Sequence, residues 1–299
     1  MMEDLVRRLI GTGAVSLWHA RAEVLAATDG GRRVPDAPDC DDALDPASLP
    51  SVKRWGVGNR MLAELDEEGF AFAVNTEDRP IFNKREKNRP RPIHKLELVL
   101  HDGRVCVRKR FRGPTFGMTR FGRIKLSLGD HAKRHVWAGL GMWFYVEAAA
   151  LLRLASLPFV PKLRGLDIKR HEVFMDYLPG ETLRQVAAGQ GQPVYDADVG
   201  VDPSLASLGA NELTAREVRL VDAAGIGNYR AEVGRMVAAM NDKGVAPLDI
   251  KPGNLLRGAR TKRLYWLDFE RARLQSQPGW TAGVETQHQL LRDLFGELA

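Results

Sequence analysis

The segment GVAPLDIKPGNLL, residues 244–256, carries side chains whose types and spacing suit phosphate chemistry. Asp249 is followed by Asn254, and Asp268 comes next in the run YWLDFE. Two oxygen ligands such as Asn254 and Asp268 suit Mg²⁺, which leaves coordination positions for phosphate oxygens. Asp249 is then placed to accept a proton from an attacking hydroxyl, and Lys251 to supply positive charge near a phosphoryl group. An Asp–Asn pair that only forms a turn is the alternative.

A strand and a helix upstream supply a second pair of charged residues. In the run VCVRK, Lys109 continues the face of Val105 and Val107, because side chains alternate along a strand. Glu147 is the sole acidic residue of an expected helix over 135–156, and it lies on the apolar stripe. A carboxylate that faces a core requires a cation or a donor, so we expect Lys109 to pair with Glu147. The alternatives are a lysine that ends its strand in water and a glutamate at a hydrated helix edge.

The elements that position these residues follow from hydrophobic periodicity and turn signals, which predict strands in the first half and helices in the second. Asp102–Gly103 favours a tight turn between two strands within 95–111. The remaining expected elements are a strand pair in 162–180, helices at 1–27, 57–66, 180–189, 228–244 and 285–298, strands at 70–74 and 263–270, a linker rich in Asp, Pro and Gly at 28–52, and a weakly structured stretch at 190–211.

Taken together and in this order, the residues resemble the protein-kinase-like superfamily. Its loops read H-R-D-x-K-P-x-N and are followed by D-F-G, where this chain has PLDIKPGN at 247–254 and DFE from Asp268. The similarity extends to Ser/Thr kinases and to small atypical members, the RIO-type and lipopolysaccharide (Kdo/heptose) kinases. It implies an α+β, two-lobed fold with a strand-rich N-lobe and a shortened helical C-lobe. The implied division is an N-terminal extension with an acidic linker and a basic segment (1–94), an N-lobe with hinge (95–178) and a C-lobe (179–299).

The resemblance also implies roles for single residues. Lys109 would contact the α and β phosphates of ATP, with Glu147 as its ion-pair partner, and Asn254 and Asp268 would hold Mg²⁺. The run FMDYLPGETL is similar to the hinge between kinase lobes. The nucleotide-binding residues implied there are Met175 as gatekeeper, the backbone of Asp176, Tyr177 and Leu178 against adenine, and Glu181 near the ribose.

The chain departs from the family pattern at three loop positions. Pro247 and Leu248 replace the histidine and arginine, and Glu270 replaces the last glycine of D-F-G. A glycine-rich loop is also missing before Lys109. We therefore expect an ATP- and Mg²⁺-dependent transfer of the γ-phosphate to a hydroxyl, with a Ser/Thr protein kinase favoured by Lys251. The alternatives are a lipopolysaccharide-core sugar kinase and a nucleotide-binding pseudokinase scaffold.

Composition bounds the class of protein and its partners. The net charge of +6 is concentrated in the basic region 79–135, which can attract an anionic partner, whereas 29–45 holds six Asp residues and two Arg residues. The basic region 79–135 has two other interpretations. It is either a solvated face without a partner or a surface that binds nucleic acid. Two distant cysteines, no long apolar run and a charged N-terminus predict a cytoplasmic protein with no transmembrane segment.

Overall fold

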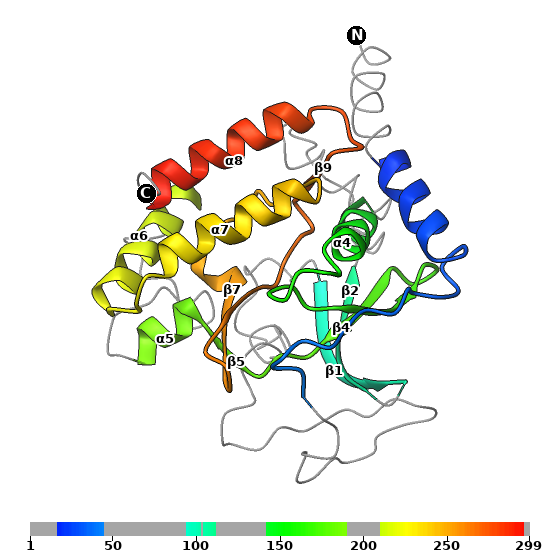
Figure 1. Ribbon diagram of the computed structural model, residues 1–299, viewed down its shortest axis with the longest axis horizontal. Coiled ribbons are helices and arrows are strands. Elements are labelled where there is room, and N and C mark those ends of the chain that lie inside the picture. The colour runs from blue at the N-terminus through cyan, green and yellow to red at the C-terminus, as the bar shows by residue number, and fades with distance from the viewer. Residues whose placement is uncertain (1–16, 45–93, 103, 112–141, 190–209, 296–299) are drawn as a thin grey trace, which may run out of the picture.

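The computed structural model describes residues 17–44, 94–102, 104–111, 142–189 and 210–295 (Figure 1). The helix expected at 57–66, the strand at 70–74 and most of the basic region 79–135 lie outside these residues. The described chain is a mixed α+β structure, as expected.

A four-stranded antiparallel sheet forms the first part of the fold, in the order β1-β2-β4-β3. β1 (His94–His101) and β2 (Arg104–Phe111) make the hairpin that the sequence predicts, with His101 opposite Arg104. Asp102 has a positive φ of 46° in the connecting turn, a conformation that Asp tolerates better than most residues. β3 (Leu163–Asp167) and β4 (Glu172–Asp176) are the second expected strand pair, and β4 pairs with β2.

Helix α4 (Met142–Arg153) packs against β3 and β4 (Figure 1). Every residue from Phe144 to Leu151 is buried, so the helix is covered on all sides rather than along one stripe. A helix over residues 17–27 contributes Ala20 and Val24 to the same hydrophobic core. We call β1–β4 and α4 the sheet region.

The chain then passes through a linking segment, residues 177–179, into a helical region. α7 (Tyr229–Asp242) and α8 (Trp280–Phe295) run beside one another in Figure 1, with α6 (Ala210–Ala223) in contact with α8 and with α5 (Leu183–Gly189). Buried side chains of α7 and α8 join those of α4 in one continuous hydrophobic core. The two regions are therefore packed together rather than joined only by the linking segment.

Two small sheets lie within the helical region. β5 (Gly180–Thr182), β7 (Leu255–Gly258) and β8 (Leu264–Trp266) form one, and β6 (Val245–Ala246) with β9 (Arg273–Leu274) forms the other. A 3₁₀ turn, η3 (Pro252–Asn254), leads directly into β7. These short strands hold both ends of the segment that carries Asp249 and Asn254.

The observed elements differ from the expected ones in several places, one being residues 180–182, which form strand β5 and not the start of a helix. The strand expected at 263–270 ends at Trp266, because Asp268 and Glu270 contact Lys109 instead of continuing the sheet. Helix α6 occupies 210–223, although the expected weakly structured stretch ended at residue 211 and no element was expected between it and residue 228. Helix α8 begins at Trp280 rather than near 285, and Gly283 lets its first turns lie against the Arg273 side chain.

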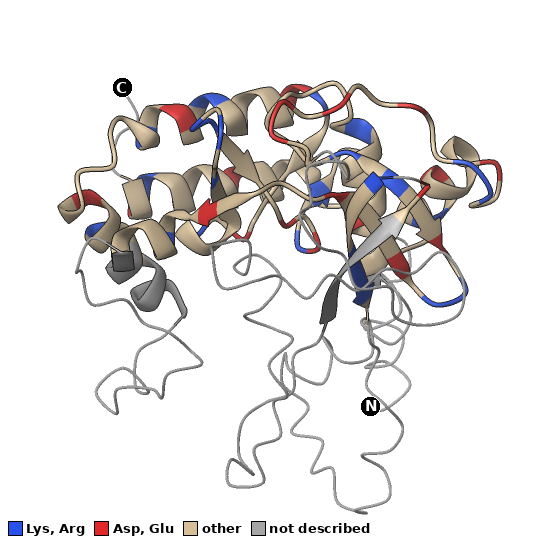
Figure 2. Ribbon diagram, turned by 90° about the horizontal axis from the view of Figure 1, so that it is seen from below, with Lys and Arg blue, Asp and Glu red and all other residues tan. Residues whose placement is uncertain are grey.

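The N-terminal residues also differ from expectation. Residues 28–44, the described part of the expected linker, lie against the rest of the chain, with Thr28, Cys40 and Asp42 buried. Acidic and basic residues are interspersed along the described ribbon (Figure 2). Among the helices of these described residues, none has the length and apolar character needed to cross a bilayer.

Candidate active site

Lys109 lies on β2, the strand with neighbours on both sides in the sheet. Its backbone pairs with Leu96 of β1 and Val173 of β4, so the lysine projects from the middle of the sheet and not from its edge. Only 6% of Lys109 is exposed. A buried ammonium requires anionic partners, and α4 and the segment after β8 supply them.

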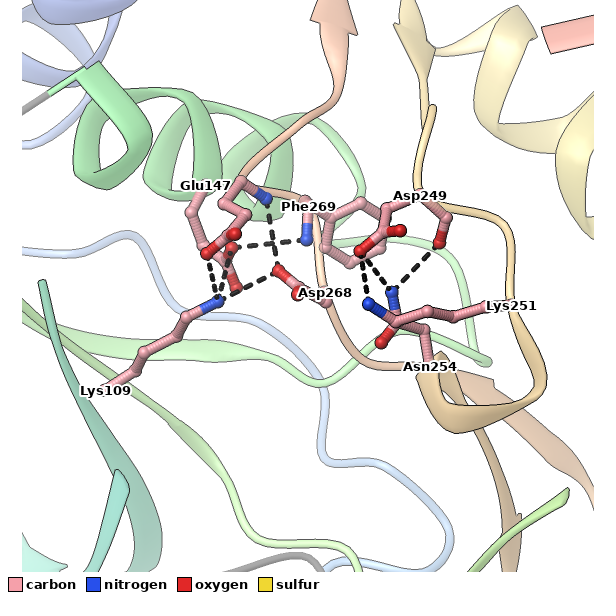
Figure 3. Close-up of polar contacts among 8 residues, drawn as sticks. Lys109, Glu147, Asp249, Lys251, Asn254, Asp268 and Phe269 are labelled. Carbon is pink, nitrogen blue, oxygen red and sulfur yellow. Dashed lines mark hydrogen bonds and ion pairs between the residues drawn. The ribbon is translucent and has the colours of Figure 1, made fainter. Parts of the chain in front are cut away.

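Three carboxylates surround the Lys109 ammonium (Figure 3). Its Nζ lies 3.1 Å from Glu147 Oε2, 2.9 Å from Asp268 Oδ1 and 3.3 Å from Glu270 Oε2. The same nitrogen is 5.0 Å from the centre of the Phe111 ring. The structure thus brings Lys109, Glu147 and Asp268 together, and it adds Glu270, for which the sequence analysis assigned no role.

One cation facing three carboxylates leaves this cluster with excess negative charge. Burial raises the pKa of Glu147 to about 8; the Lys109 ammonium opposes this shift, while Asp268 and Glu270 reinforce it. Burial also acts to raise the pKa of Asp268, but the charge and hydrogen bond of Lys109 hold it well below its usual range. The three carboxylates raise the pKa of Lys109 despite its burial. Lys109 and Asp268 are therefore charged at neutral pH, while burial and the neighbouring carboxylates oppose the ionisation of Glu147.

The turn at Asp268 is fixed to α4 through its backbone. Phe269 N–H donates to Glu147 Oε2 at 3.2 Å, and Glu270 N–H donates to Asp268 Oδ1 at 3.3 Å. Phe269 itself is 1% exposed and belongs to the hydrophobic core. Glu147 thus accepts hydrogen bonds from both Lys109 and the turn, and it links three elements that are distant in sequence.

The loop with Asp249, Lys251 and Asn254 lies beside this cluster (Figure 3). Lys251 Nζ is 2.7 Å from Asp249 Oδ2, and Asn254 Nδ2 donates to the backbone oxygen of Asp249 at 2.9 Å and to its Oδ2 at 3.2 Å. The backbone oxygen of Asn254 also accepts a hydrogen bond, of 3.0 Å, from the N–H of Leu267, the residue just before Asp268. The loop is therefore closed on itself and tied to the chain that carries Asp268.

Pro247 stands where the family has a supporting histidine, and α8 supplies a different support. The buried side chain of Gln287 donates from Nε2 to the carbonyl oxygen of Pro247 at 3.1 Å. Its Oε1 accepts a hydrogen bond from Asn241 Nδ2 of α7 at 2.8 Å. The start of the loop is thus anchored to both long helices.

The residues expected to meet a nucleotide lie where β4 becomes the linking segment. Met175, Asp176, Tyr177 and Leu178 are all buried. Glu181 is exposed on β5, opposite Arg257 of β7. Their positions follow the expected order along the chain, and their contact with a nucleotide remains a prediction.

The donor groups at the site fit a divalent cation that prefers oxygen ligands. Carboxylate oxygens of Glu147, Asp268 and Glu270 lie within 4.8 Å of one another, and the Asn254 amide comes from the adjacent loop. Hard oxygen donors of this kind suit Mg²⁺. Asp268 is ionised at neutral pH and can therefore offer a charged oxygen to such an ion.

Sequence reasoning missed two residues of this site. Glu270 was treated only as a departure from glycine, although a carboxylate two positions after Asp268 could have been weighed as a further partner of Lys109. Gln287 carried no usable signal, because a single glutamine in an amphipathic helix is ordinary and its partner Pro247 is 40 residues away.

The resemblance implies a strand lysine paired with a helix glutamate. The structure shows this pair and adds the aspartate of the D-F-x turn as a further partner of the lysine. The described chain resembles the protein-kinase-like fold. No family model matches the chain, and neither does any curated protein. Among solved structures 139 chains match.

One of these is a crystal structure of the Rio2 kinase from Chaetomium thermophilum in an ADP/Mg²⁺–phosphoaspartate complex. It shares 15% sequence identity over 68% of this chain, with a TM-score of 0.40. The match covers 52% of the Rio2 chain, so this protein spans about half the length of that kinase chain.

Proposed function

We propose that the protein is an ATP- and Mg²⁺-dependent phosphotransferase that moves the γ-phosphate of ATP to a hydroxyl group. The observation that carries the proposal is the contact of the Lys109 ammonium with both Glu147 and Asp268, beside the Asp249 loop. In this proposal the sheet region and the helical region are the two lobes of the kinase, and the linking segment after β4 is the hinge.

The nucleotide would be held by three groups of residues. Lys109 would bind its α and β phosphates, since the ammonium is oriented by Glu147 and Asp268. Asp268 and Asn254 would hold Mg²⁺, which when bound neutralises charge on the phosphate oxygens. Adenine would meet the backbone of residues 176–178, with Met175 as gatekeeper and Glu181 near the ribose.

Transfer itself would rely on Asp249 and Lys251. The acceptor oxygen would attack the γ-phosphorus as the bond to the ADP oxygen breaks, and its proton would pass to an Asp249 carboxylate oxygen. Lys251, 2.7 Å from that carboxylate, would place positive charge where the phosphoryl group moves. The hydrogen bonds from Asn254 hold Asp249 in place for this role.

The acceptor we favour is a Ser or Thr side chain of a protein. The support is the lysine two positions after Asp249, which accompanies such acceptors in the family that the chain resembles, and its direct contact with Asp249. A lipopolysaccharide-core sugar is the acceptor to compare with it in the assay.

The test is ATP turnover by the purified protein with Mg²⁺, using a protein substrate and a Kdo-containing lipopolysaccharide core as acceptors. Asp268→Ala is expected to abolish Mg²⁺-dependent ATP binding, and Asp249→Ala to spare binding but remove transfer. Asp242→Ala, at an exposed aspartate near the end of α7, is the matched control and keeps full turnover.

Three results would contradict parts of the proposal. Full turnover by Asp249→Ala would exclude it as the proton acceptor. ATP binding without turnover by the wild type on either acceptor would favour a pseudokinase scaffold. Transfer to the sugar but not to the protein would replace the favoured acceptor while keeping the phosphotransferase.

A further inference from the structure

Residues 37–44 cross from the sheet region to the helical region along the linking segment (Figure 1). We call them the hinge splint. They belong to the acidic stretch that the sequence predicted to be a linker, yet Cys40 is 5% and Asp42 is 4% exposed. Burying a carboxylate such as Asp42 costs free energy unless it is fully hydrogen-bonded, so its partners indicate what this segment does.

The first part of the hinge splint binds the sheet region through Arg164 of β3. Arg164 donates to the carbonyl oxygen of Ala37 at 2.8 Å and to Asp39 Oδ1 at 2.7 Å. The same guanidinium holds Asp176 through two bonds, of 2.6 and 2.9 Å, and Arg104 of β2 also pairs with Asp39. Asp176 is the last residue of β4, so this network fixes the point where the linking segment begins.

The second part binds the helical region through the turn between β7 and β8. Asp42 Oδ1 accepts the backbone N–H groups of Arg260 and Thr261 at 3.0 and 3.1 Å. Its Oδ2 accepts the Tyr265 hydroxyl at 2.8 Å and the Thr261 hydroxyl. Burial opposes ionisation, but these bonds hold the pKa of Asp42 below its ordinary value. Asp42 is therefore an ionised carboxylate, and among the described residues it accepts four hydrogen bonds from the helical region.

The hinge splint also contacts the linking segment itself. Leu44 N–H donates to the Tyr177 carbonyl oxygen at 3.4 Å. Cys40 packs with Leu178 of the linking segment, and with Leu256 and Tyr265 of the helical region, in a small hydrophobic cluster separate from the main core. One short segment thus binds the sheet region, the linking segment and the helical region at once.

We propose that the hinge splint fixes the linking segment in its nucleotide-binding geometry, and that Asp42 is a positioning residue for ATP. This rests on the proposed function, since residues 176–178 are the expected adenine site. The physical reason is a population effect. If the linking segment also samples geometries that cannot bind ATP, the apparent affinity for ATP is the intrinsic affinity multiplied by the fraction of molecules that can bind it. The molecules that can bind ATP react as before.

Three variants test the proposal in the full chain. Asp42→Ala removes the carboxylate that holds the helical region. Gly258→Ala perturbs the same contact from β7, because a Cβ there would lie 2.3 Å from Asp42 Oδ2. Asp36→Ala is the matched control, since the side chain of Asp36 is 100% exposed just before the hinge splint.

The first readout is amide hydrogen exchange, which needs no enzymatic activity. In Asp42→Ala and Gly258→Ala we expect exchange at residues 176–178 to be about tenfold faster, with the amides of α7 unchanged and Asp36→Ala like the wild type. The second readout is kinetic. The KM for ATP is expected to rise about tenfold in Asp42→Ala, with kcat within about twofold of the wild type.

A purely structural role would give a different pattern. Loss of folded protein speeds exchange in α7 as well, and it lowers kcat per total protein without raising KM. Unchanged exchange at 176–178, or an unchanged KM in both variants, would overturn the proposal. If the wild type binds no ATP, the proposed function fails, and exchange at 176–178 still decides whether the hinge splint fixes the linking segment.

Discussion

Replacing Gln287 by methionine tests whether α8 supports the Asp249 loop. The side chain is fully buried and makes two hydrogen bonds, donating to the Pro247 carbonyl and accepting from the Asn241 amide. Methionine has a similar length and fits the same space without either polar group. The change therefore removes the polar contacts while keeping most of the packing.

The expected loss of stability follows from those two contacts. Each hydrogen bond contributes about 0.5–1.5 kcal/mol net, and a buried group left without its partner costs about 1–3 kcal/mol. Both partners, the Pro247 oxygen and the Asn241 amide, lose a bond in a part-buried site. Allowing for the favourable burial of the methionine side chain, we expect Gln287→Met to lower the free energy of unfolding by about 2–4 kcal/mol.

Urea denaturation measures this loss, as a shift of about 1 M in Cm with an unchanged slope. The matched control is Gln289→Met, on the same helix, where the side chain is exposed and bonds its neighbours Asp293 and Arg292. We expect the control to change stability by less than about 0.5 kcal/mol. Equal losses in the two variants would refute the anchoring role of Gln287.

Three further changes test other parts of the structure. Because the pKa of Glu147 is raised from 4.5 to about 8, the folded protein keeps a proton that the unfolded chain releases. The free energy of unfolding is then expected to fall as the pH rises from about 5 to about 8, and a urea series on Glu147→Gln should lack this slope. Burial raises the pKa of Cys40 and Cys106 to about 12, so mass spectrometry after iodoacetamide treatment at about pH 8 is expected to find both unmodified unless denaturant is present. A Cβ at Gly180 would lie 2.3 Å from the backbone oxygen of Arg257 on the paired strand β7, so Gly180→Ala is expected to lower stability by about 1–3 kcal/mol, and an unchanged Cm would contradict that contact.

The local elements near the site were largely predictable from the sequence. The β1–β2 hairpin follows from two alternating runs around Asp102, and α7 follows from a strong helical pattern closed by Gly244, which has a φ of 72°. These signals depend on residues within a few positions of one another, where backbone geometry and side-chain periodicity act directly. The position of Lys109 on the inner face of its strand follows in the same way.

Other elements could not be read from local patterns. Strand β8 stops at Trp266 although the run to Glu270 is suited to a longer strand, because Asp268 and Glu270 turn away to meet Lys109. Contacts with Lys109, 159 residues away from Asp268, decide this, and no local propensity records them. In the sequence, likewise, Glu270 could be recognised only as the residue that replaces the last glycine of D-F-G.

By itself the sequence determined which groups this protein has available for phosphate chemistry and the order in which they occur along the chain. Only the tertiary structure decided which of them meet and what supports them. In the folded chain Gln287 donates a hydrogen bond to Pro247, the residue that stands in place of the family histidine. The acidic stretch that resembled a linker includes the hinge splint, which is held by contacts such as that of Asp42 with Tyr265. The physical reason is that Asp42 and Tyr265, 223 residues apart, are joined by burial and hydrogen bonding that exist only once the chain has folded.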